Sequence, residues 1–276
     1  MLVGTPIGNL GDLAPRAVEA LAGATVIAAE DTRRTRVLLS HAGVSLSSQR
    51  LVALHAHNEA EMSARLVDQM VAGARVAYVT DAGMPGISDP GERLVRAALA
   101  RGLPVEAVPG PSAALTALVI SGLPTARFVF EGFLPRKGAE RAARLAALTA
   151  EERTAVIFES PRRLAATLAD LAAALGPDRP VAVARELTKL FETVWRGPLG
   201  EAVTGGPEPR GEQVIVIGPA GPRPDPGDDE VAEALRTELE RGASKRDAAA
   251  VVAKRLGVSR RRTYELASNI PASGPV

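Results

Sequence analysis

Three carboxylates stand where short apolar runs with strand character come to an end. Glu30 and Asp31 follow the run Thr25–Ala29, and Asp81 follows the end of the run Arg75–Thr80. A carboxylate in such a position can take up a proton, hold a ligand amine or cap the next helix or turn. Asp31 would cap the helix that follows it, and Asp81 is open to either interpretation. These positions mark a candidate site without deciding its chemistry.

Loops rich in glycine and proline accompany these carboxylates. They span Gly4–Asp12, Thr80–Gly91 and Pro109–Ala113, and the third runs directly into a helix. Glycine and proline let backbone groups approach a ligand at fixed angles, and a helix start favours an anion. Two long loops of this kind at strand ends favour a ligand site over plain turn chemistry. For Asp89, late in the second loop, capping a helix that starts at Gly91 is the stronger interpretation.

Nucleotide and metal motifs are weak or absent. The chain has no G-x-G-x-x-G, and Glu92 stands where a P-loop requires lysine. His55, His57 and Glu59 could form a metal cluster, but a third convergent histidine is missing, and we expect no metal site. The chain has no cysteine, which excludes a disulfide scaffold, a thiol nucleophile and any cysteine-ligated metal.

Alternating strand and helix patterns position these loops. Short β-rich runs alternate with stretches of helical period, which predicts an α/β fold with a mostly parallel sheet, helices on both faces and a ligand beyond the carboxyl ends of the strands. The expected strands are Thr25–Ala29, Arg50–Leu54, Arg75–Thr80, Pro104–Val108 and Phe128–Glu131, and the expected helices are Pro15–Ala22, Thr32–His41, Glu59–Ala72, Gly91–Ala100 and Ser112–Ser121.

A second pattern begins near Thr125. Two adjacent expected strands have no long helix between them, so a hairpin enters a mixed sheet. The strands are Val181–Glu186, Leu190–Gly197 and Glu212–Gly218, preceded by helices near Lys137–Leu148 and Pro161–Leu175.

A proline-rich segment and a helical tail complete the chain. Four prolines between Pro219 and Pro226 predict a stiff linker. Helices are then expected over Glu230–Glu240, Lys245–Leu256 and Arg260–Ala267, with Gly257 as a C-cap and Ser259 as an N-cap. The expected parts are two α/β domains, 1–123 and 124–218, a linker, 219–229, and a basic helical tail, 230–276.

Composition and charge limit the class of protein. The 276 residues carry 33 basic and 32 acidic side chains, and 46% are hydrophobic. These values exclude wholesale disorder and a polycation, so any nucleic-acid contact must rest on local patches. No apolar run approaches the ~20 residues of a membrane span, and the first residues do not have the pattern of a signal peptide. We expect a soluble, cytoplasmic protein with no membrane partner.

Eight ordered motifs between Leu2 and about Gly218 resemble one enzyme family. They look like ribosomal RNA small subunit methyltransferases, which belong to the tetrapyrrole-methylase-like class of S-adenosylmethionine methyltransferases. A basic helical tail is also usual in that family. The motifs are GTPIGNLGDL, AAEDTRRTRVLL, LHAHNE, VTDAGMPGISDPGERLV, VPGPSAALTALVISGLPT, FEGFLPRKG, FESPRRL and ARELTKLFE.

The resemblance implies an activity and a donor site. It implies methylation of the ribose 2′-OH of a decoding-site cytidine in 16S rRNA, by a homodimer that binds S-adenosyl-L-methionine in the cleft between two α/β domains. The implied donor-binding residues are Asp81, Gly83, Ile87, Ser88, Ser112, Ala113, Glu159, Leu187, Gln213 and Val214.

The expected chemistry needs little from the protein beyond alignment and a base. A sulfonium donor is already activated, so methyl transfer requires no metal and no protein nucleophile, whereas the weakly acidic 2′-OH needs a base or a charge that favours the alkoxide. Neither the family pattern nor the sequence decides which residue serves. The candidates are Asp31, Glu30, His55 and Lys189, with Asp89 behind them.

RNA contacts should be basic. For the three arginines after Asp31, phosphate contact and a solvated helix face are equally good accounts. The tail window Arg241–Arg262 carries eight Lys/Arg against one acidic residue in a layout that resembles a helix-turn-helix. RNA contact is favoured over a solvated three-helix appendage or a dimer brace, because so much like charge would repel itself without a polyanion. With 3% aromatic residues, phosphate charge should outweigh base stacking. The candidates are Arg33, Arg34, Arg36, Arg136, Lys137, Arg162, Arg163, Lys245, Arg246, Arg260, Arg261 and Arg262.

Two other functions stay open. A methyltransferase of the same fold that acts on a tetrapyrrole would predict an apolar, aromatic-lined cleft and no basic tail. A non-enzymatic RNA-binding protein that retains the fold would not bind the methyl donor.

Overall fold

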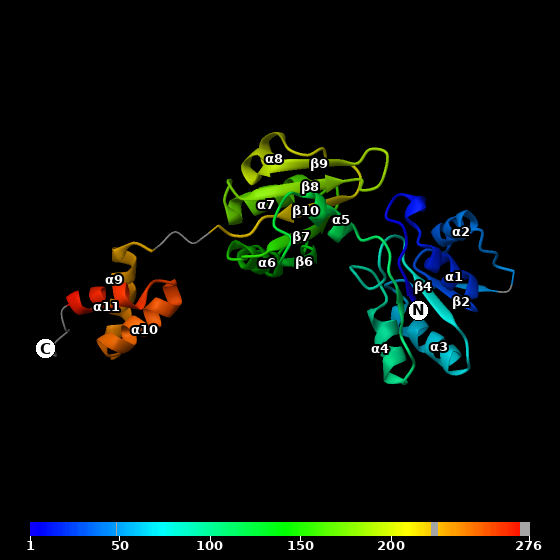
Figure 1. Cartoon of the computed structure of the whole chain (residues 1–276), viewed down its shortest axis with the longest axis horizontal. Helices are drawn as coiled ribbons and strands as arrows, with labels where there is room; N and C mark the ends of the chain where they lie inside the picture. The colour runs from blue at the N-terminus through cyan, green and yellow to red at the C-terminus, as the bar shows by residue number, and fades with distance from the viewer. Residues whose placement is uncertain (48, 222–225, 271–276) are drawn as a thin grey trace. The chain divides into compact units, whose positions relative to one another are not determined.

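The computed structural model describes residues 1–47, 49–221 and 226–270. The chain divides into two compact units, Met1–Ala220 and Gly221–Val276, and Figure 1 labels most of their helices and strands. Residues 222–225 of the expected linker and 271–276 of the expected tail lie outside the described residues.

The first sheet is parallel throughout and has the order β3-β2-β4-β1-β5. Residues of the central strands are buried on both faces: Ile27 and Ala29 pack against α1 and α2, whereas Val26 and Ala28 pack against α3 and α4. The expected parallel sheet with two covered faces is therefore confirmed. Its elements are β1 (Leu2–Val3), β2 (Val26–Ala29), β3 (Arg50–Ala53), β4 (Val76–Val79), β5 (Ala107–Val108), a 3-10 turn (Leu10–Asp12), α1 (Pro15–Gly23), α2 (Thr32–His41), α3 (Glu59–Val71) and α4 (Glu92–Ala100).

The second sheet is mixed and has the order β6-β7-β10-β8-β9. Its β6–β7 pair is parallel and the other pairs are antiparallel, including the expected hairpin of β8 and β9. Helices α6, α7 and α8 cover one face, and α5 packs on the other face although it precedes residue 124. The elements are α5 (Ala113–Ile120), β6 (Phe128–Phe133), α6 (Ala139–Thr149), β7 (Thr154–Glu159), α7 (Leu164–Leu175), β8 (Pro180–Arg185), β9 (Thr193–Pro198), α8 (Leu199–Gly205) and β10 (Gln213–Ile217).

The hairpin turn differs from the sequence expectation. Strand β9 begins at Thr193 rather than at Leu190, because the chain turns tightly after β8. Glu186 and Thr188 have positive φ angles of 51° and 66°, and the Lys189 N–H donates to the Glu186 carbonyl at 3.0 Å. The apolar residues Leu190 and Phe191, which suggested a strand, therefore lie in an exposed loop.

The described residues of the second unit form three short helices around their own apolar core. These are α9 (Asp228–Glu240), α10 (Lys245–Leu256) and α11 (Arg260–Asn269), packed through residues that include Val231, Leu235 and Val252. Gly257 adopts the expected left-handed C-cap, and the Ser259 hydroxyl accepts from the Arg262 N–H as the expected N-cap. No helix in the described part of the chain is long and apolar enough to cross a membrane.

Candidate functional site

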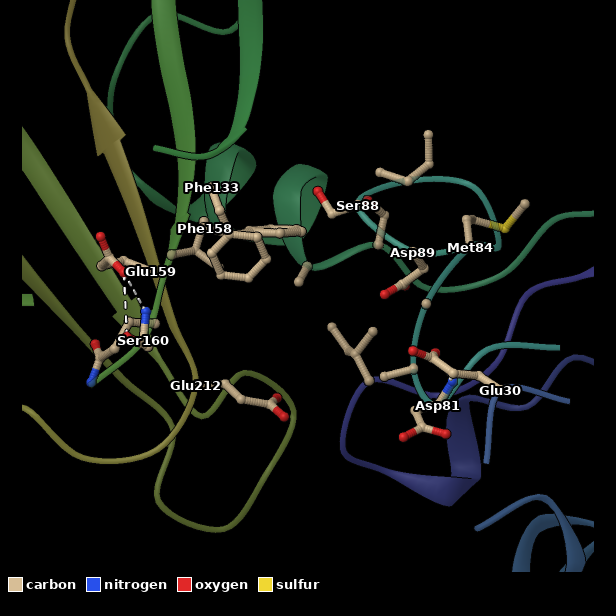
Figure 2. A pocket seen from close by; sticks show the side chains of 18 of the residues that line it. Glu30, Asp81, Met84, Ser88, Asp89, Phe133, Phe158, Glu159, Ser160 and Glu212 are labelled. Carbon is tan, nitrogen blue, oxygen red and sulfur yellow. Dashed lines mark hydrogen bonds between the residues drawn. The ribbon is translucent and has the colours of Figure 1, made fainter. Parts of the chain in front are cut away.

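A cavity of about 440 Å³ lies in the first unit, where loops from both sheets meet (Figure 2). One wall comes from the carboxyl ends of β2 and β4, and the other comes from β6, the end of β7 and the start of β10. The cavity therefore has the expected place beyond the strand ends. Its lining consists of Ile7, Glu30, Arg34, Asp81, Ala82, Gly83, Met84, Ile87, Ser88, Asp89, Ser112, Ala113, Phe133, Phe158, Glu159, Ser160, Pro161, Glu212, Gln213 and Val214.

The three glycine-rich loops are held together by close backbone contacts. The backbones of Thr5 and Gly83 exchange hydrogen bonds at 2.9 and 3.1 Å. A Cβ on Gly4 would lie 2.7 Å from the Gly110 backbone, and a Cβ on Gly110 would lie 2.8 Å from Gly4. Only glycine fits at both positions, so these residues let the first and third loops pack directly against each other.

The wall from the first sheet is acidic. The Asp81 N–H donates to Glu30 Oε2 at 3.2 Å, and Asp81 accepts from the Asp31 N–H at 3.2 Å. Arg34 forms an ion pair with Asp81 at 3.3 Å. Asp89, from the loop after β4, completes a set of three carboxylates on this wall (Figure 2).

Burial and mutual repulsion change how these carboxyl groups titrate. Burial raises the pKa of Asp89 to about 7, and the charges of Glu30 and Asp81 add to the effect. Burial also raises the pKa of Glu30, against the opposing hydrogen bond from the Asp81 N–H. Both shifts disfavour the ionised form, so a bound cation would stabilise the ionised carboxylates of this wall.

The wall from the second sheet combines aromatic rings with a fixed carboxylate. Phe133 and Phe158 meet edge to face with centroids 5.7 Å apart. The Glu159 side chain has no exposed surface, and it accepts from the Ser160 N–H at 2.7 Å and from the Thr167 hydroxyl at 2.6 Å. Arg163 pairs with Glu159 at 3.4 Å, so this carboxylate is fully engaged within the protein.

Gln213 presents an unsatisfied oxygen in the same wall. Its side-chain NH₂ donates to the carbonyls of Glu208 and Arg210 at 3.1 and 2.6 Å. The buried Oε1 atom has no partner among the described residues. Because a buried acceptor without a donor is costly, a ligand N–H at this position would be favourable.

The residues expected to bind a donor largely converge on the cavity. All of them line it except Leu187, which is buried in the apolar core beside Ile7 and Val214. Sequence reasoning missed both aromatic residues of this lining, Phe133 and Phe158. Their motifs, FEGF and FES, were available as a signal, but a strand pattern does not tell which apolar side chains face a cavity.

The four proton-acceptor candidates have separate places. Glu30 lines the cavity, whereas the other three do not. Asp31 is the N-cap of α2, as expected, and hydrogen bonds from Arg33 lower the pKa of Asp31 to about 2. His55 is half-buried, and its Nδ1 atom has no hydrogen-bond partner among the described residues.

Lys189 is engaged in ion pairs on the second sheet. Its Nζ donates to Glu186 at 3.0 Å and to Glu212 at 3.3 Å. Although burial opposes the change, these contacts raise the pKa of Lys189, so the amine stays protonated and cannot accept a proton.

The capping role expected for Asp89 is wrong. Helix α4 has Gly91 as its N-cap and no capping side chain of its own. Glu59, at the start of α3, instead accepts from the N–H groups of Gly91 and Arg93 at 2.8 and 3.1 Å. The cap comes from a neighbouring helix, which local sequence spacing does not reveal.

The arginines near the cavity fall into two groups. Arg34 lines the cavity, and Arg33 and Arg36 are exposed on the same helix. Arg163 donates to the Leu134 carbonyl at 2.7 Å and is half-buried, so it supports the wall. The remaining basic side chains near the cleft, Arg136, Lys137 and Arg162, are exposed.

The tail residues divide in the same way. Lys245 donates to the carbonyls of Ser268 and Ile270 at 3.1 and 2.7 Å, and Arg262 pairs with Asp228 at 2.8 Å. These two residues hold the three helices together. A surface groove of the second unit is lined by Arg246, Ala249, Ala250, Arg260, Arg261 and Tyr264.

Comparisons with known proteins agree on one family. The family described as Tetrapyrrole (Corrin/Porphyrin) Methylases matches residues 1–203. Ribosomal RNA small subunit methyltransferase I of Synechocystis is 43% identical over 277 residues, which cover 99% of this chain and 98% of the relative. The protein of the same name from Escherichia coli O157:H7 is 43% identical over 96% of this chain and 93% of the relative.

Solved structures share the fold at lower identity. The methyltransferase CobJ has a TM-score of 0.61 and 20% identity, covering 80% of this chain and 94% of CobJ. Uroporphyrin-III C-methyl transferase from Thermus thermophilus, complexed with S-adenyl homocysteine, has a TM-score of 0.55 and 23% identity, covering 78% of this chain and 95% of that one. These likenesses establish the α/β fold of the first unit.

Proposed function

The chain belongs to the tetrapyrrole methylase family and, within it, to the ribosomal RNA small subunit methyltransferase I group, and from that premise we propose that it methylates 16S rRNA. The proposed methyl acceptor is the ribose 2′-hydroxyl of a decoding-site cytidine in the small ribosomal subunit. The proposed methyl donor is S-adenosyl-L-methionine, and the proposed place of action is the cytoplasm.

The acidic wall of the cavity supports the donor part of this proposal, and the basic groove of the second unit, which a tetrapyrrole methyltransferase would not be expected to have, favours RNA as the acceptor. S-adenosyl-L-methionine supplies an activated methyl group on a positively charged sulfur. Glu30, Asp81 and Asp89 would favour the positive charge of such a donor. Phe158 offers an aromatic surface for a base, and the unsatisfied Gln213 Oε1 offers an acceptor for an N–H group.

Further donor contacts follow from the lining. The N-terminus of α5, where Ser112 caps the helix, would favour the donor carboxylate. The backbone of the loop at Gly83, Ile87 and Ser88 would surround the rest of the donor, with Ala113 and Val214 packing beside it. Glu159 would act indirectly, because its carboxylate oxygens already hold Ser160 and Thr167.

We assign RNA contact to the exposed basic side chains. Near the cavity these are Arg33, Arg34 and Arg36, together with Arg136, Lys137 and Arg162. In the second unit they are the groove residues Arg246, Arg260 and Arg261. Arg163, Lys245 and Arg262 are assigned to support of the fold, since each is half-buried and makes hydrogen bonds or ion pairs inside its own unit.

The proposed assembly is a homodimer that buries exposed apolar side chains. Leu190 is 90% exposed, Phe191 is 70% exposed and Val119, on α5, is 68% exposed. Large apolar side chains at this exposure favour contact with another protein surface. We expect Leu190→Asp combined with Phe191→Asp to shift the protein from dimer to monomer in sedimentation velocity. A wild-type monomer at micromolar concentration would contradict the proposal.

Transfer of a tritiated methyl group tests the function directly. The substrates are 30S subunits that lack the modification, naked 16S rRNA and tetrapyrrole precursors. We expect label on 30S subunits and, after nuclease digestion, in a 2′-O-methylcytidine nucleoside. Label found only on a tetrapyrrole would overturn the proposal, and a failure of S-adenosyl-L-methionine to bind in calorimetry would indicate a protein that only retains the fold.

A further inference from the structure

Asp89 differs from the other carboxylates that line the cavity. Glu30 accepts from the Asp81 N–H, Asp81 pairs with Arg34, and Glu159 and Glu212 have partners as well. The Asp89 carboxylate has no hydrogen-bond or ion-pair partner among the residues that the structure describes. Its oxygens are therefore available to a ligand.

The capping role that could occupy Asp89 belongs to Glu59. The N–H groups at the start of α4 donate to Glu59, so Asp89 is not needed as a cap. The side chain is half-buried and points into the cavity, on the same side as Glu30 and Asp81 (Figure 2). An unpartnered carboxylate in this position is costly for folding, which calls for a functional reason.

The backbone around Asp89 is constrained. Ser88 has a φ angle of 64°, which is unusual for a residue with a side chain, and Gly91 has a φ angle of 136°. The Gly86 N–H donates to the Pro90 carbonyl at 3.1 Å, which closes the loop around Ser88 and Asp89. Backbone strain of this kind clusters at functional sites, where it fixes the direction of a side chain.

We propose that the Asp89 carboxylate accepts the proton of the ribose 2′-hydroxyl during methyl transfer. This inference rests on the function proposed above. As the hydroxyl oxygen forms its bond to the methyl carbon, the carbon–sulfur bond breaks and its electron pair stays on sulfur, which becomes a neutral thioether. The hydroxyl proton moves to Asp89, which turns neutral and later releases the proton to solvent.

The surroundings of Asp89 make this proton transfer sensitive to pH. The charged and titratable groups around it are Glu30 after β2, Tyr78 on β4, Asp81 after β4, and Arg34 on α2, which pairs with Asp81. Because burial and the carboxylates raise the pKa of Asp89 to about 7, it can take up a proton and release it near neutral pH. The ionised, active form is present above that pH.

The test compares single-turnover rate constants of Asp89→Asn, Glu30→Gln and wild type on 30S subunits between pH 5.5 and 9. Wild type should show a rate that rises with pH and levels off above the pKa of Asp89. Asp89→Asn should be slower by ~10²–10⁴-fold, the usual contribution of a positioned base, and should lack this rise. Donor affinity, measured by calorimetry, should change far less.

Glu30→Gln gives a second readout that does not depend on whether Asp89→Asn folds. Removing the Glu30 charge should move the midpoint of the pH profile to lower pH, because one repelling carboxylate is lost. Asp68→Asn, which removes an exposed carboxylate on α3 paired with Arg101, is the matched control and should leave rate and midpoint unchanged.

The outcomes separate the inference from the proposed function. If wild type methylates 30S subunits but folded Asp89→Asn keeps the wild-type rate or the wild-type pH rise, the inference is overturned and the function stands. If Asp89→Asn does not fold, an unmoved midpoint in Glu30→Gln overturns it. If wild type methylates no RNA, the proposed function itself fails.

Discussion

At the scale of single residues, contacts decide which acidic side chains are available for chemistry. Asp31 and Asp89 both precede a helix. The Asp31 carboxylate accepts hydrogen bonds from the N–H and the guanidinium of Arg33, whereas the helix after Asp89 is capped by Glu59, which leaves the Asp89 carboxylate without this role. Hydrogen bonds from Arg33 lower the pKa of Asp31 to about 2, whereas burial, together with the charges of Glu30 and Asp81, raises the pKa of Asp89 to about 7.

The raised pKa of Asp89 predicts a pH-dependent stability difference. Between its usual pKa and about 7 the folded protein binds more protons at this site than the unfolded chain does, so the site makes the protein less stable as pH rises. Asp89→Asn should therefore raise the free energy of unfolding by ~1 kcal/mol at pH 8, a value kept small because solvent screens the exposed part of the carboxylate. Near pH 4 the difference should vanish. Urea denaturation at both pH values measures it, and an equal gain at both would contradict this account.

The buried hydrogen bond between Thr167 and Glu159 predicts a second residue-level effect. Thr167→Val keeps the shape of the side chain but removes the hydroxyl, which donates to the fully buried Glu159 carboxylate at 2.6 Å. The expected loss in the free energy of unfolding is ~1–3 kcal/mol. Thr167→Ser, which retains the hydroxyl, should lose clearly less in the same urea experiment. Equal losses would indicate that packing of the methyl group, and not the hydrogen bond, is what matters.

At the scale of elements, the boundaries of a helix can be predicted from the spacing of residues next to it in sequence, whereas the elements that it packs against cannot. Helix α2 spans the expected Thr32–His41, with the expected cap, because cap and helix are adjacent in sequence. Strand boundaries agree less well with the sequence expectation. Strand β5 has only two residues, and β9 starts three residues after the expected Leu190, because residues of the preceding turn have left-handed backbone conformations. Helix α8 (Leu199–Gly205) was missed, since its glycines weaken the helical pattern.

Because Glu59 on α3 caps α4, we predict that a substitution on α3 changes both the stability of α4 and the loop before it. Glu59→Ala removes the acceptor for the Gly91 and Arg93 N–H groups, and we expect a loss of ~1 kcal/mol, the usual cost of losing an N-cap. Donor affinity should also fall, because the loop that carries Ser88 and Asp89 ends at this cap. Glu61→Ala, which breaks only an exposed pair with Arg65, serves as control and should change neither quantity measurably. A Glu59→Ala protein with unchanged stability and donor affinity would show that the cap is dispensable.

At the scale of the whole molecule, basic side chains are found in both units, as the proposed contact with RNA would require. The first unit holds the cavity, and the second presents three arginines in a groove beside Tyr264. A near-neutral net charge of +1 therefore conceals a local basic surface. Lys245 and Arg262 do not add to it as ligand contacts, because their charged ends are used within the second unit.

Salt dependence tests the role of this groove. A chain ending at Ala220 should bind S-adenosyl-L-methionine as the full chain does but bind 30S subunits more weakly. Arg246→Ala and Arg260→Ala should each lower the slope of log affinity against log salt by ~1, as expected for the loss of one phosphate contact. Arg236→Ala, outside the groove and paired with Glu233, is the matched control. Unchanged slopes in the groove variants would assign the tail to another task.

The sequence by itself determined the family, the α/β class and the mixed second sheet, and nine of the ten residues that it named for the donor site line the cavity. It could do so because each strand-end loop is contiguous in sequence and shows its glycines and prolines as a pattern, whereas the contact of Gly4 with Gly110 joins two distant loops and is visible only in the structure. Only the tertiary structure decided which carboxylate is free. Packing between elements brings in distant partners, such as Glu59 for the start of α4 and Glu212 for Lys189, and these partners cannot be read from local spacing.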